Sequence, residues 1–130
     1  MKLLLDTHVW LWLALEPERL SRKATAAVDD ATNEVFLSPI SVWETLVLAR
    51  RGRIDLEQDP QKWVGAALGR TPATVAELTH AVAMRSETLP GFRSRDPADR
   101  FLVATALVGD LALVTADRAM RRYRPLRTLW

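Results

Sequence analysis

The feature that most constrains the fold is the alternation of short apolar stretches with helical stretches along the whole chain. Three stretches have the pattern of buried strands, namely Lys2–Leu5, Glu34–Ser38 and Leu111–Thr115. A sequence that favours the start of a helix follows each of them. Strands that alternate with helices usually form a mostly parallel sheet covered on both faces. The sequence therefore predicts an α/β fold, a three-layer α/β/α sandwich with a mostly parallel central sheet.

Helices are expected where a residue that favours a helix N-terminus precedes a stretch rich in apolar residues. Examples are Ser21, Thr79 and the Asp96-Pro97 pair. The expected helices span residues 8–15, 22–30, 41–50, 60–68, 80–87, 97–108 and 118–122. Two further short strands are expected at Thr74–Leu78 and Arg127–Trp130. Because the 130 residues contain no internal repeat and no linker, we expect a single domain over residues 1–130.

Composition excludes several classes of protein. The chain has no cysteine, which removes disulfides, thiolate zinc sites and thiol catalysis. No apolar run reaches the roughly 18 residues of a membrane span, and the N-terminus lacks the pattern of a signal peptide. The sequence also contains no phosphate-binding glycine loop and no GxSxG motif. A cytoplasmic protein is expected, without disulfides and without a membrane partner.

Positive charge is concentrated although the net charge is only +2. Arginines gather within residues 50–53, 93–100 and 118–127, and they far outnumber the lysines. Arginine suits phosphate because its planar guanidinium donates two parallel hydrogen bonds. A solvated surface explains these segments equally well, so both interpretations stay open.

Four acidic residues fall near the junctions at which strands pass into helices. Asp6 ends the first strand, Asp117 follows the strand at 111–115, Asp99 lies in the first turn of a helix, and Glu44 lies one turn into another. The carboxyl ends of parallel strands share one edge of the sheet, where ligands bind. We therefore expect these four side chains to converge.

Helix capping explains some of these acids without a ligand. Asp6 or Thr7 is a suitable N-cap, Asp96 fits the N-cap before Pro97, and Asp117 suits a turn. Together, however, converging carboxylates repel each other and require a counter-ion. Oxygen ligands without cysteine favour Mg²⁺ or Mn²⁺, the ions that support phosphodiester hydrolysis. The pattern as a whole therefore indicates a metal-dependent nuclease.

Four motifs resemble those of PIN-domain ribonucleases, and in particular the VapC toxins of bacterial type II toxin–antitoxin (VapBC) systems. They are LLLDTHVWLW at 3–12, SPISVWE at 38–44, RDPADRFLVATAL at 95–107 and LVTAD at 113–117. The resemblance covers essentially the whole chain in order. The resemblance departs at Ser94, where one subgroup of VapC toxins often has histidine. It is also loose over residues 52–89.

The resemblance implies an endoribonuclease that uses Mg²⁺, with Mn²⁺ as a substitute, and hydrolyses RNA. Its four acids are both the catalytic residues and the metal ligands: Asp6, Glu44, Asp99 and Asp117. Supporting positions are Thr7, Thr115 and Asp96, and candidate RNA contacts are Arg95, Arg100 and Arg118. The family also implies a homodimer and inhibition by a cognate VapB-type antitoxin.

Other functions remain open at this point. A PIN nuclease that processes RNA without an antitoxin would have the same acids, and an adjacent small gene would distinguish it. A catalytically silent domain that binds RNA or protein would usually have lost one acid. A phosphatase with an aspartyl nucleophile would need a lysine near the acids, and none of the three lysines lies near an acidic motif.

Two apolar features suggest contacts with other chains. The helix at His8–Leu15 is apolar on nearly every side, so it is either a central core helix or one whose tryptophan reaches a two-fold interface. Near Glu44, a second apolar group is either simply part of the core, which is the simpler interpretation for most of its members, or a surface that could receive an amphipathic antitoxin helix. It consists of Trp43, Leu46, Val47 and Trp63.

Overall fold

The computed structural model describes all 130 residues, and its five strands form one sheet in the order β3-β2-β1-β4-β5. The strands are β1 (Lys2–Leu5), β2 (Glu34–Leu37), β3 (Thr74–Val75), β4 (Ala112–Val114) and β5 (Thr128–Leu129). Every neighbouring pair is parallel. The predicted α/β class is confirmed, and the sheet is parallel throughout.

Seven α-helices and one short 3-10 helix connect the strands. They are α1 (Thr7–Leu15), the 3-10 helix Pro17–Arg19, α2 (Arg22–Asp29), α3 (Pro39–Arg50), α4 (Pro60–Arg70), α5 (His80–Ser86), α6 (Pro97–Gly109) and α7 (Arg118–Arg122). Side chains cap the N-termini as the sequence predicts at Ser21, Thr79 and Asp96. The helix expected at Ser41 begins two residues earlier, at Pro39, because the Ser38 hydroxyl caps it and proline suits the first position.

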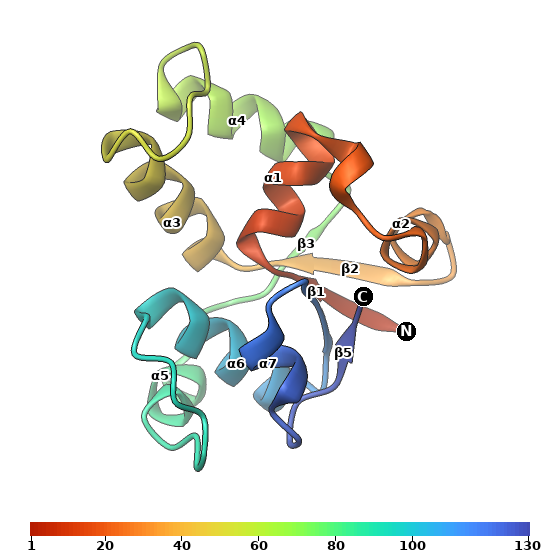
Figure 1. Ribbon diagram of the computed structural model, residues 1–130, viewed down its shortest axis with the longest axis vertical. Helices are drawn as coiled ribbons and strands as arrows, with labels where there is room; N and C mark the ends of the chain where they lie inside the picture. Colours follow the sequence, from red (N-terminus) through yellow and green to blue (C-terminus); the bar gives the residue numbers. More distant parts are fainter.

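The two faces of the sheet are covered by different helices, which gives the three layers (Figure 1). Leu3 and Leu5 belong to a cluster with residues of α1 and α4, whereas Leu4 belongs to a cluster with residues of α6 and α7. Successive side chains of a strand point to opposite faces, so β1 contributes to both clusters. Its burial on both sides places β1 at the centre of the molecule.

The apolar helix α1 belongs to the core. Trp10 is fully buried, its indole N–H donates to the Thr71 hydroxyl at 3.0 Å, and its ring meets the edge of Trp63. Trp12 is half-buried between Trp130 and Arg19. Trp63 is itself only 4% exposed, so its predicted role in receiving an antitoxin is wrong.

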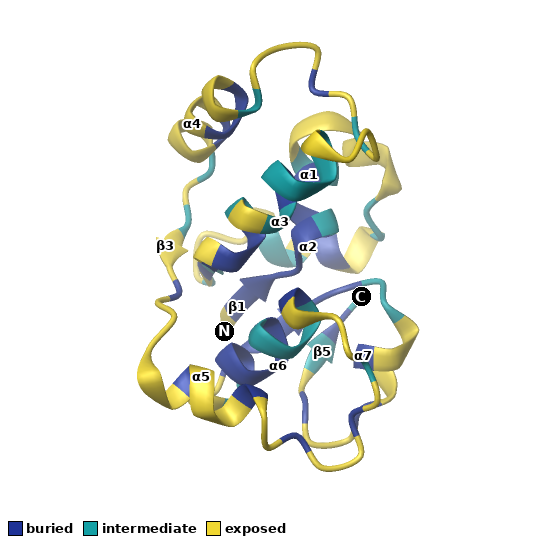
Figure 2. Cartoon of the chain, turned by 90° about the vertical axis from the view of Figure 1, so that its left-hand side faces the viewer, coloured by how far each residue is buried: buried dark blue, intermediate teal, exposed yellow.

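Exposure is uneven across the fold. In Figure 2, β1 and the inner side of α6 are buried, whereas α5 and the edge strand β3 are largely exposed. None of the helices combines the length and hydrophobicity that a membrane crossing requires.

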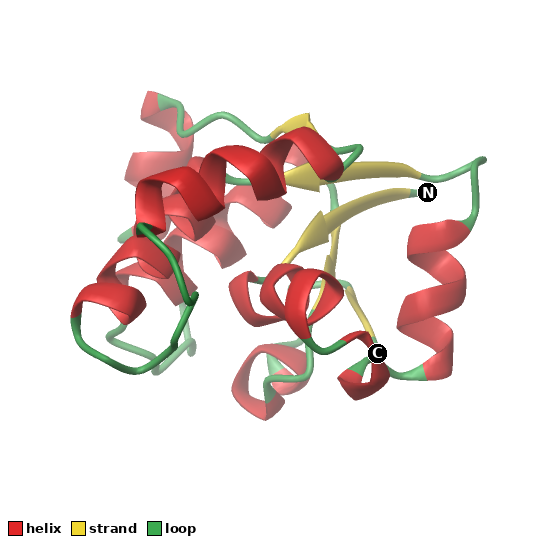
Figure 3. Ribbon diagram, turned by 90° about the horizontal axis from the view of Figure 1, so that it is seen from above, coloured by secondary structure: helices red, strands yellow, loops and turns green.

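The strand order creates a switch point between β1 and β4. The chain passes from β1 to β2 on one side, while β4 pairs with β1 on the other side. In parallel sheets, the crevice beyond the carboxyl ends at such a point is the usual ligand site. In Figure 3, β1 and β2 point toward the side where most of the helices gather.

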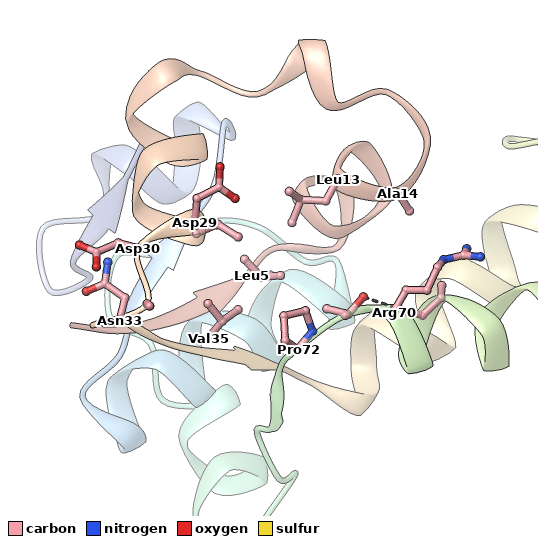
Figure 4. A pocket seen from close by; sticks show the side chains of 13 residues that line it. Leu5, Leu13, Ala14, Asp29, Asp30, Asn33, Val35, Arg70 and Pro72 are labelled. Atoms are coloured by element: carbon pink, nitrogen blue, oxygen red, sulfur yellow. Dashed lines mark hydrogen bonds between the residues drawn. The ribbon is translucent and has the colours of Figure 1, made fainter.

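A pocket of about 560 Å³ lies elsewhere, between the sheet residues Leu5 and Val35 and residues of α1, α2 and the end of α4 (Figure 4). Asp29, Asp30 and Arg70 line it together with apolar side chains. None of the four motif acids does, so this pocket is separate from the predicted site.

Candidate active site

Asp6 is the central and most buried acid of the predicted site. It directly follows β1, is 1% exposed, and caps α1 by accepting the Thr7 backbone N–H at 2.7 Å on Oδ1. Its other oxygen, Oδ2, accepts the Thr115 hydroxyl at 2.6 Å and contacts His8 Nε2 at 3.0 Å. Asp6 is therefore an N-cap, as the simpler interpretation predicts, and also the centre of a polar cluster.

Thr115 links the ends of the two central strands. Leu5 of β1 is paired with Val114 of β4, so the residues that follow them lie side by side. The Thr115 hydroxyl donates to Asp6 and accepts the Asp117 backbone N–H at 3.0 Å. Asp117 in turn caps α7 by accepting the Met120 N–H at 3.0 Å. One fully buried hydroxyl thus fixes the acids of two motifs relative to each other.

Glu44 lies on α3, which packs against α1 and α6. Burial raises the pKa of its carboxyl, and the negative charges of Asp96 and Asp6 raise it further. The Thr7 hydroxyl and the charge of His8 oppose this rise. The mutual effects show that Glu44 lies within electrostatic reach of the cluster around Asp6.

Asp99 is held at the first turn of α6. The Ser94 hydroxyl donates to its Oδ2 at 2.9 Å, and its backbone N–H donates to the capping carboxylate of Asp96 at 3.2 Å. Burial raises the pKa of Asp99 to about 7, and the charges of Asp96, Asp6 and Asp117 contribute to the rise. Asp96 is exposed and serves as the helix cap, so it supports the site through its charge.

His8 is the basic group of the cluster. Its hydrogen bond to Asp6 raises the pKa of the imidazole despite partial burial, and the charges of Glu44 and Asp117 act in the same direction. When protonated, the imidazole offsets part of the negative charge of the neighbouring carboxylates.

The sequence interpretation missed three residues of this cluster: His8, Ser41 and Ser94. Ser41 is fully buried and its Oγ lies 3.0 Å from the Thr7 hydroxyl. Each of the three lies within a quoted motif or beside one, within five residues of an acid. That proximity is the signal that could have found them.

The four acids suit a hard divalent cation by donor type and by charge. Burial and the charges of neighbouring carboxylates raise the pKa values of Glu44 and Asp99, and a bound cation would relieve both effects. In the conformation described, no three acidic or histidine side chains are arranged to share one ion. Joint ligation therefore requires the carboxylates to turn toward a common point.

The predicted RNA-contacting arginines differ in their surroundings. Arg100 is committed to the fold, because its guanidinium donates to the backbone carbonyls of Ser86 and Ser94 at 2.9 Å each. Its predicted role as an RNA contact is not supported by this geometry. Arg95 and Arg118 are exposed and make no side-chain hydrogen bond.

Comparison with known proteins places this chain in a family. The family model for the PIN domain matches residues 3–125. The chain is 39% identical to ribonuclease VapC22 of Mycobacterium tuberculosis (strain ATCC 25618 / H37Rv) over 129 residues, which covers 98% of this chain and 97% of that protein.

Solved structures show the same fold at low sequence identity. VapBC2 from Rickettsia felis, bound to a promoter DNA fragment, matches with a TM-score of 0.73 and 14% identity, over 98% of this chain and 97% of the matched chain. VapBC-1 from nontypeable Haemophilus influenzae matches with a TM-score of 0.72 and 16% identity, over 98% and 96%.

Proposed function

The chain belongs to the PIN-domain family and is a VapC-type ribonuclease toxin, and we propose that it hydrolyses RNA phosphodiester bonds with Mg²⁺ at its four acids. The observation that carries this proposal is the polar cluster at the switch point of the sheet. Hydrogen bonds through Thr115 link Asp6 and Asp117, and the charges of neighbouring acids raise the pKa values of Glu44 and Asp99.

Asp6 and Asp99 are proposed as the principal metal ligands, with Asp117 completing or supporting the site. Glu44 is proposed to bind a second ion or to orient the attacking water. When bound, Mg²⁺ or Mn²⁺ supplies positive charge that activates water and stabilises the leaving oxygen. Magnesium retains several waters, so contact through water suits the more distant ligands.

The chain's own groups have separate tasks in this proposal. The Thr115 hydroxyl holds Asp6 and the backbone of Asp117 in fixed relation. Burial raises the pKa of Glu44, which makes its carboxylate a better acceptor for the proton of an attacking water. His8 contacts Asp6 and, when protonated, offsets part of the charge of the cluster.

The competing functions are less well supported. A silent binding domain has no need for half-buried carboxylates such as Glu44 and Asp99, whose pKa values are raised by burial and by neighbouring acids. An RNA-processing nuclease without an antitoxin would share the same chemistry. The similarity to a VapC ribonuclease over 98% of the chain favours the toxin.

We propose that a VapB-type antitoxin docks beside α3. Trp43 is 49% exposed and, with Leu46 and Val47, lines a hollow of about 410 Å³. Arg50, Pro60 and Gln61 complete its lining. An amphipathic helix could place apolar side chains here while an antitoxin arginine reaches the acids.

A homodimer is also proposed. The sheet edge at β3 has no partner strand on its outer side, and Val75 there is 61% exposed. Val75 lines one hollow with Val108, which is 47% exposed. An uncovered apolar sheet edge is a common place for a second chain to bind. Sedimentation at micromolar concentration tests this, and monomer alone contradicts it.

The function itself is tested by mapping cleaved RNA ends after brief expression in cells without the antitoxin. New ends are expected with the wild-type chain and not with Asp6→Asn. The purified wild-type chain should cleave the mapped RNA with Mg²⁺ and stop when EDTA is added. Cleavage that persists in EDTA would contradict the proposed metal dependence.

A further inference from the structure

Three arginines of α7 line a hollow that the proposed catalytic role leaves without a function. Arg118, Arg121 and Arg122, together with Thr128 of β5, line a space of about 390 Å³ that contains no apolar residue. Residues separated by three and four positions share one face of a helix, so the three guanidinium groups project together.

These arginines have no partner within the chain. None of them takes part in an ion pair, and none donates a side-chain hydrogen bond. Other arginines of the chain are committed: Arg100 holds backbone carbonyls, and Arg127 pairs with Asp110 at 2.8 Å. The hollow therefore presents concentrated positive charge without a counter-ion.

The hollow and the acidic cluster are connected by neighbouring residues of the chain. Asp117 caps α7, and Arg118 is the next residue. Arg118 and Arg122 are separated by about 6 Å along the helix axis. An RNA strand whose scissile bond lies at the acids would place an adjacent phosphate near this face of α7.

We propose that the hollow binds backbone phosphates of the RNA substrate next to the bond that is cut. This inference rests on the proposed ribonuclease function and names a binding site for its substrate. Guanidinium groups donate paired hydrogen bonds to phosphate oxygens. The Thr128 hydroxyl is a further donor. A docked antitoxin helix is disfavoured here because the hollow offers no apolar contact.

The test measures RNA binding without cleavage. The parent protein is Asp6→Asn, and the probe is a short fluorescein-labelled single-stranded RNA followed by fluorescence anisotropy over a range of salt concentrations. Adding Arg121→Gln and Arg122→Gln should weaken binding roughly tenfold. The slope of the logarithm of the binding constant against the logarithm of the salt concentration should become less steep by about 1.4 if two phosphate contacts are lost.

A matched control removes the same charge elsewhere. Arg51→Gln with Arg53→Gln, beyond the end of α3, should change affinity much less. Equal losses in both double variants would overturn the site, because they would reflect net charge alone. Retained RNA binding with weakened binding of a purified antitoxin would also overturn it, in favour of a protein partner.

Two further measurements keep the result interpretable. Thermal melts of both double variants check that each remains folded. Cleavage by the wild-type chain is measured separately. Its absence would contradict the proposed ribonuclease function, whereas the anisotropy result would still show whether the hollow binds RNA. Arg121→Lys with Arg122→Lys should recover part of the affinity, since lysine keeps the charge but loses the paired donors.

Discussion

The acidic cluster and the arginine hollow meet at one peptide bond, between Asp117 and Arg118, yet they are built in opposite ways. Asp6 is 1% exposed and has partners at both carboxylate oxygens. The arginines of the hollow are exposed and have none within the chain. The centre of one patch is buried and hydrogen-bonded, whereas the other patch is exposed.

This difference matches two different tasks. Groups that act on reacting atoms must be held in place, and burial strengthens their electrostatic interactions. Groups that hold a polyanionic strand can remain mobile, because attraction to phosphate is long-ranged and tolerant of geometry. We therefore expect changes in the two patches to affect different kinetic constants.

The largest expected effect is the loss of catalysis on Asp6→Asn. Because the substitution removes the charge of a proposed metal ligand, kcat should fall on the order of 10³-fold or more. Arg121→Gln should instead raise KM several-fold and spare kcat, because it removes only binding that is equal in ground and transition states. Steady-state cleavage of a labelled RNA separates these effects. A kcat loss of the same size in both variants would erase the distinction.

Metal binding should stabilise the protein through the acidic cluster alone. Mg²⁺ at about 100 times its Kd should add roughly 2.7 kcal/mol to the free energy of unfolding. Thermal melts with and without Mg²⁺ should show this gain in the wild-type chain and in Arg121→Gln. The gain should disappear in Asp6→Asn. An unchanged wild-type midpoint would show that the acids do not form a shared metal site.

Antitoxin and Mg²⁺ should compete, since both are proposed to bring positive charge to the same carboxylates. By linkage, saturating Mg²⁺ should weaken antitoxin affinity by the factor by which antitoxin weakens Mg²⁺ affinity. Titration calorimetry of the purified antitoxin with and without Mg²⁺ measures this factor. Equal affinities in both buffers would mean that the antitoxin inhibits by blocking RNA access.

The metal-free protein should lose stability as pH rises from about 4 to 7. Asp99 has a pKa of about 7 in the folded protein and an ordinary value of 3.8. Between these values the folded chain holds a proton that the unfolded chain has released, so unfolding becomes easier as pH rises. Asp99→Asn should flatten the profile of melting temperature against pH in EDTA. An identical slope in both proteins would assign the pH dependence to other groups.

The smallest expected effect comes from Ser94→Ala. The Ser94 hydroxyl lowers the pKa of Asp99 by donating to its carboxylate. Its loss should shift the acid limb of the kcat/KM profile upward by less than about one pH unit. Arg95→Gln is the control, because Arg95 is a nearby residue without a contact to Asp99. A shift of the same size in that variant would point to general charge instead of the hydrogen bond.

Much of the fold could be predicted from the sequence because its signals are local. Strand β1 has the predicted bounds, and α7 does as well. Each helix start depends on a cap within three residues, as at Ser21 and Thr79. The four acids could be placed at strand-to-helix junctions for the same reason.

The surroundings of individual side chains required the tertiary structure. Arg100 and Arg118 look alike in the sequence, yet Arg100 reaches carbonyls of residues up to 14 positions away, while Arg118 stays exposed. Trp43 and Trp63 also look alike, and only the packing of α4 against the core buries Trp63.

The sequence by itself determined the order of elements, their caps and the identity of the acids, because those depend on neighbours along the chain. Only the tertiary structure decided that Thr115 joins Asp6 across 109 residues and that Arg100 reaches the carbonyl of Ser86. It also left the three arginines of α7 without partners. These contacts depend on the pairing of β1 with β4 and on how the helices pack, and no local pattern encodes that arrangement.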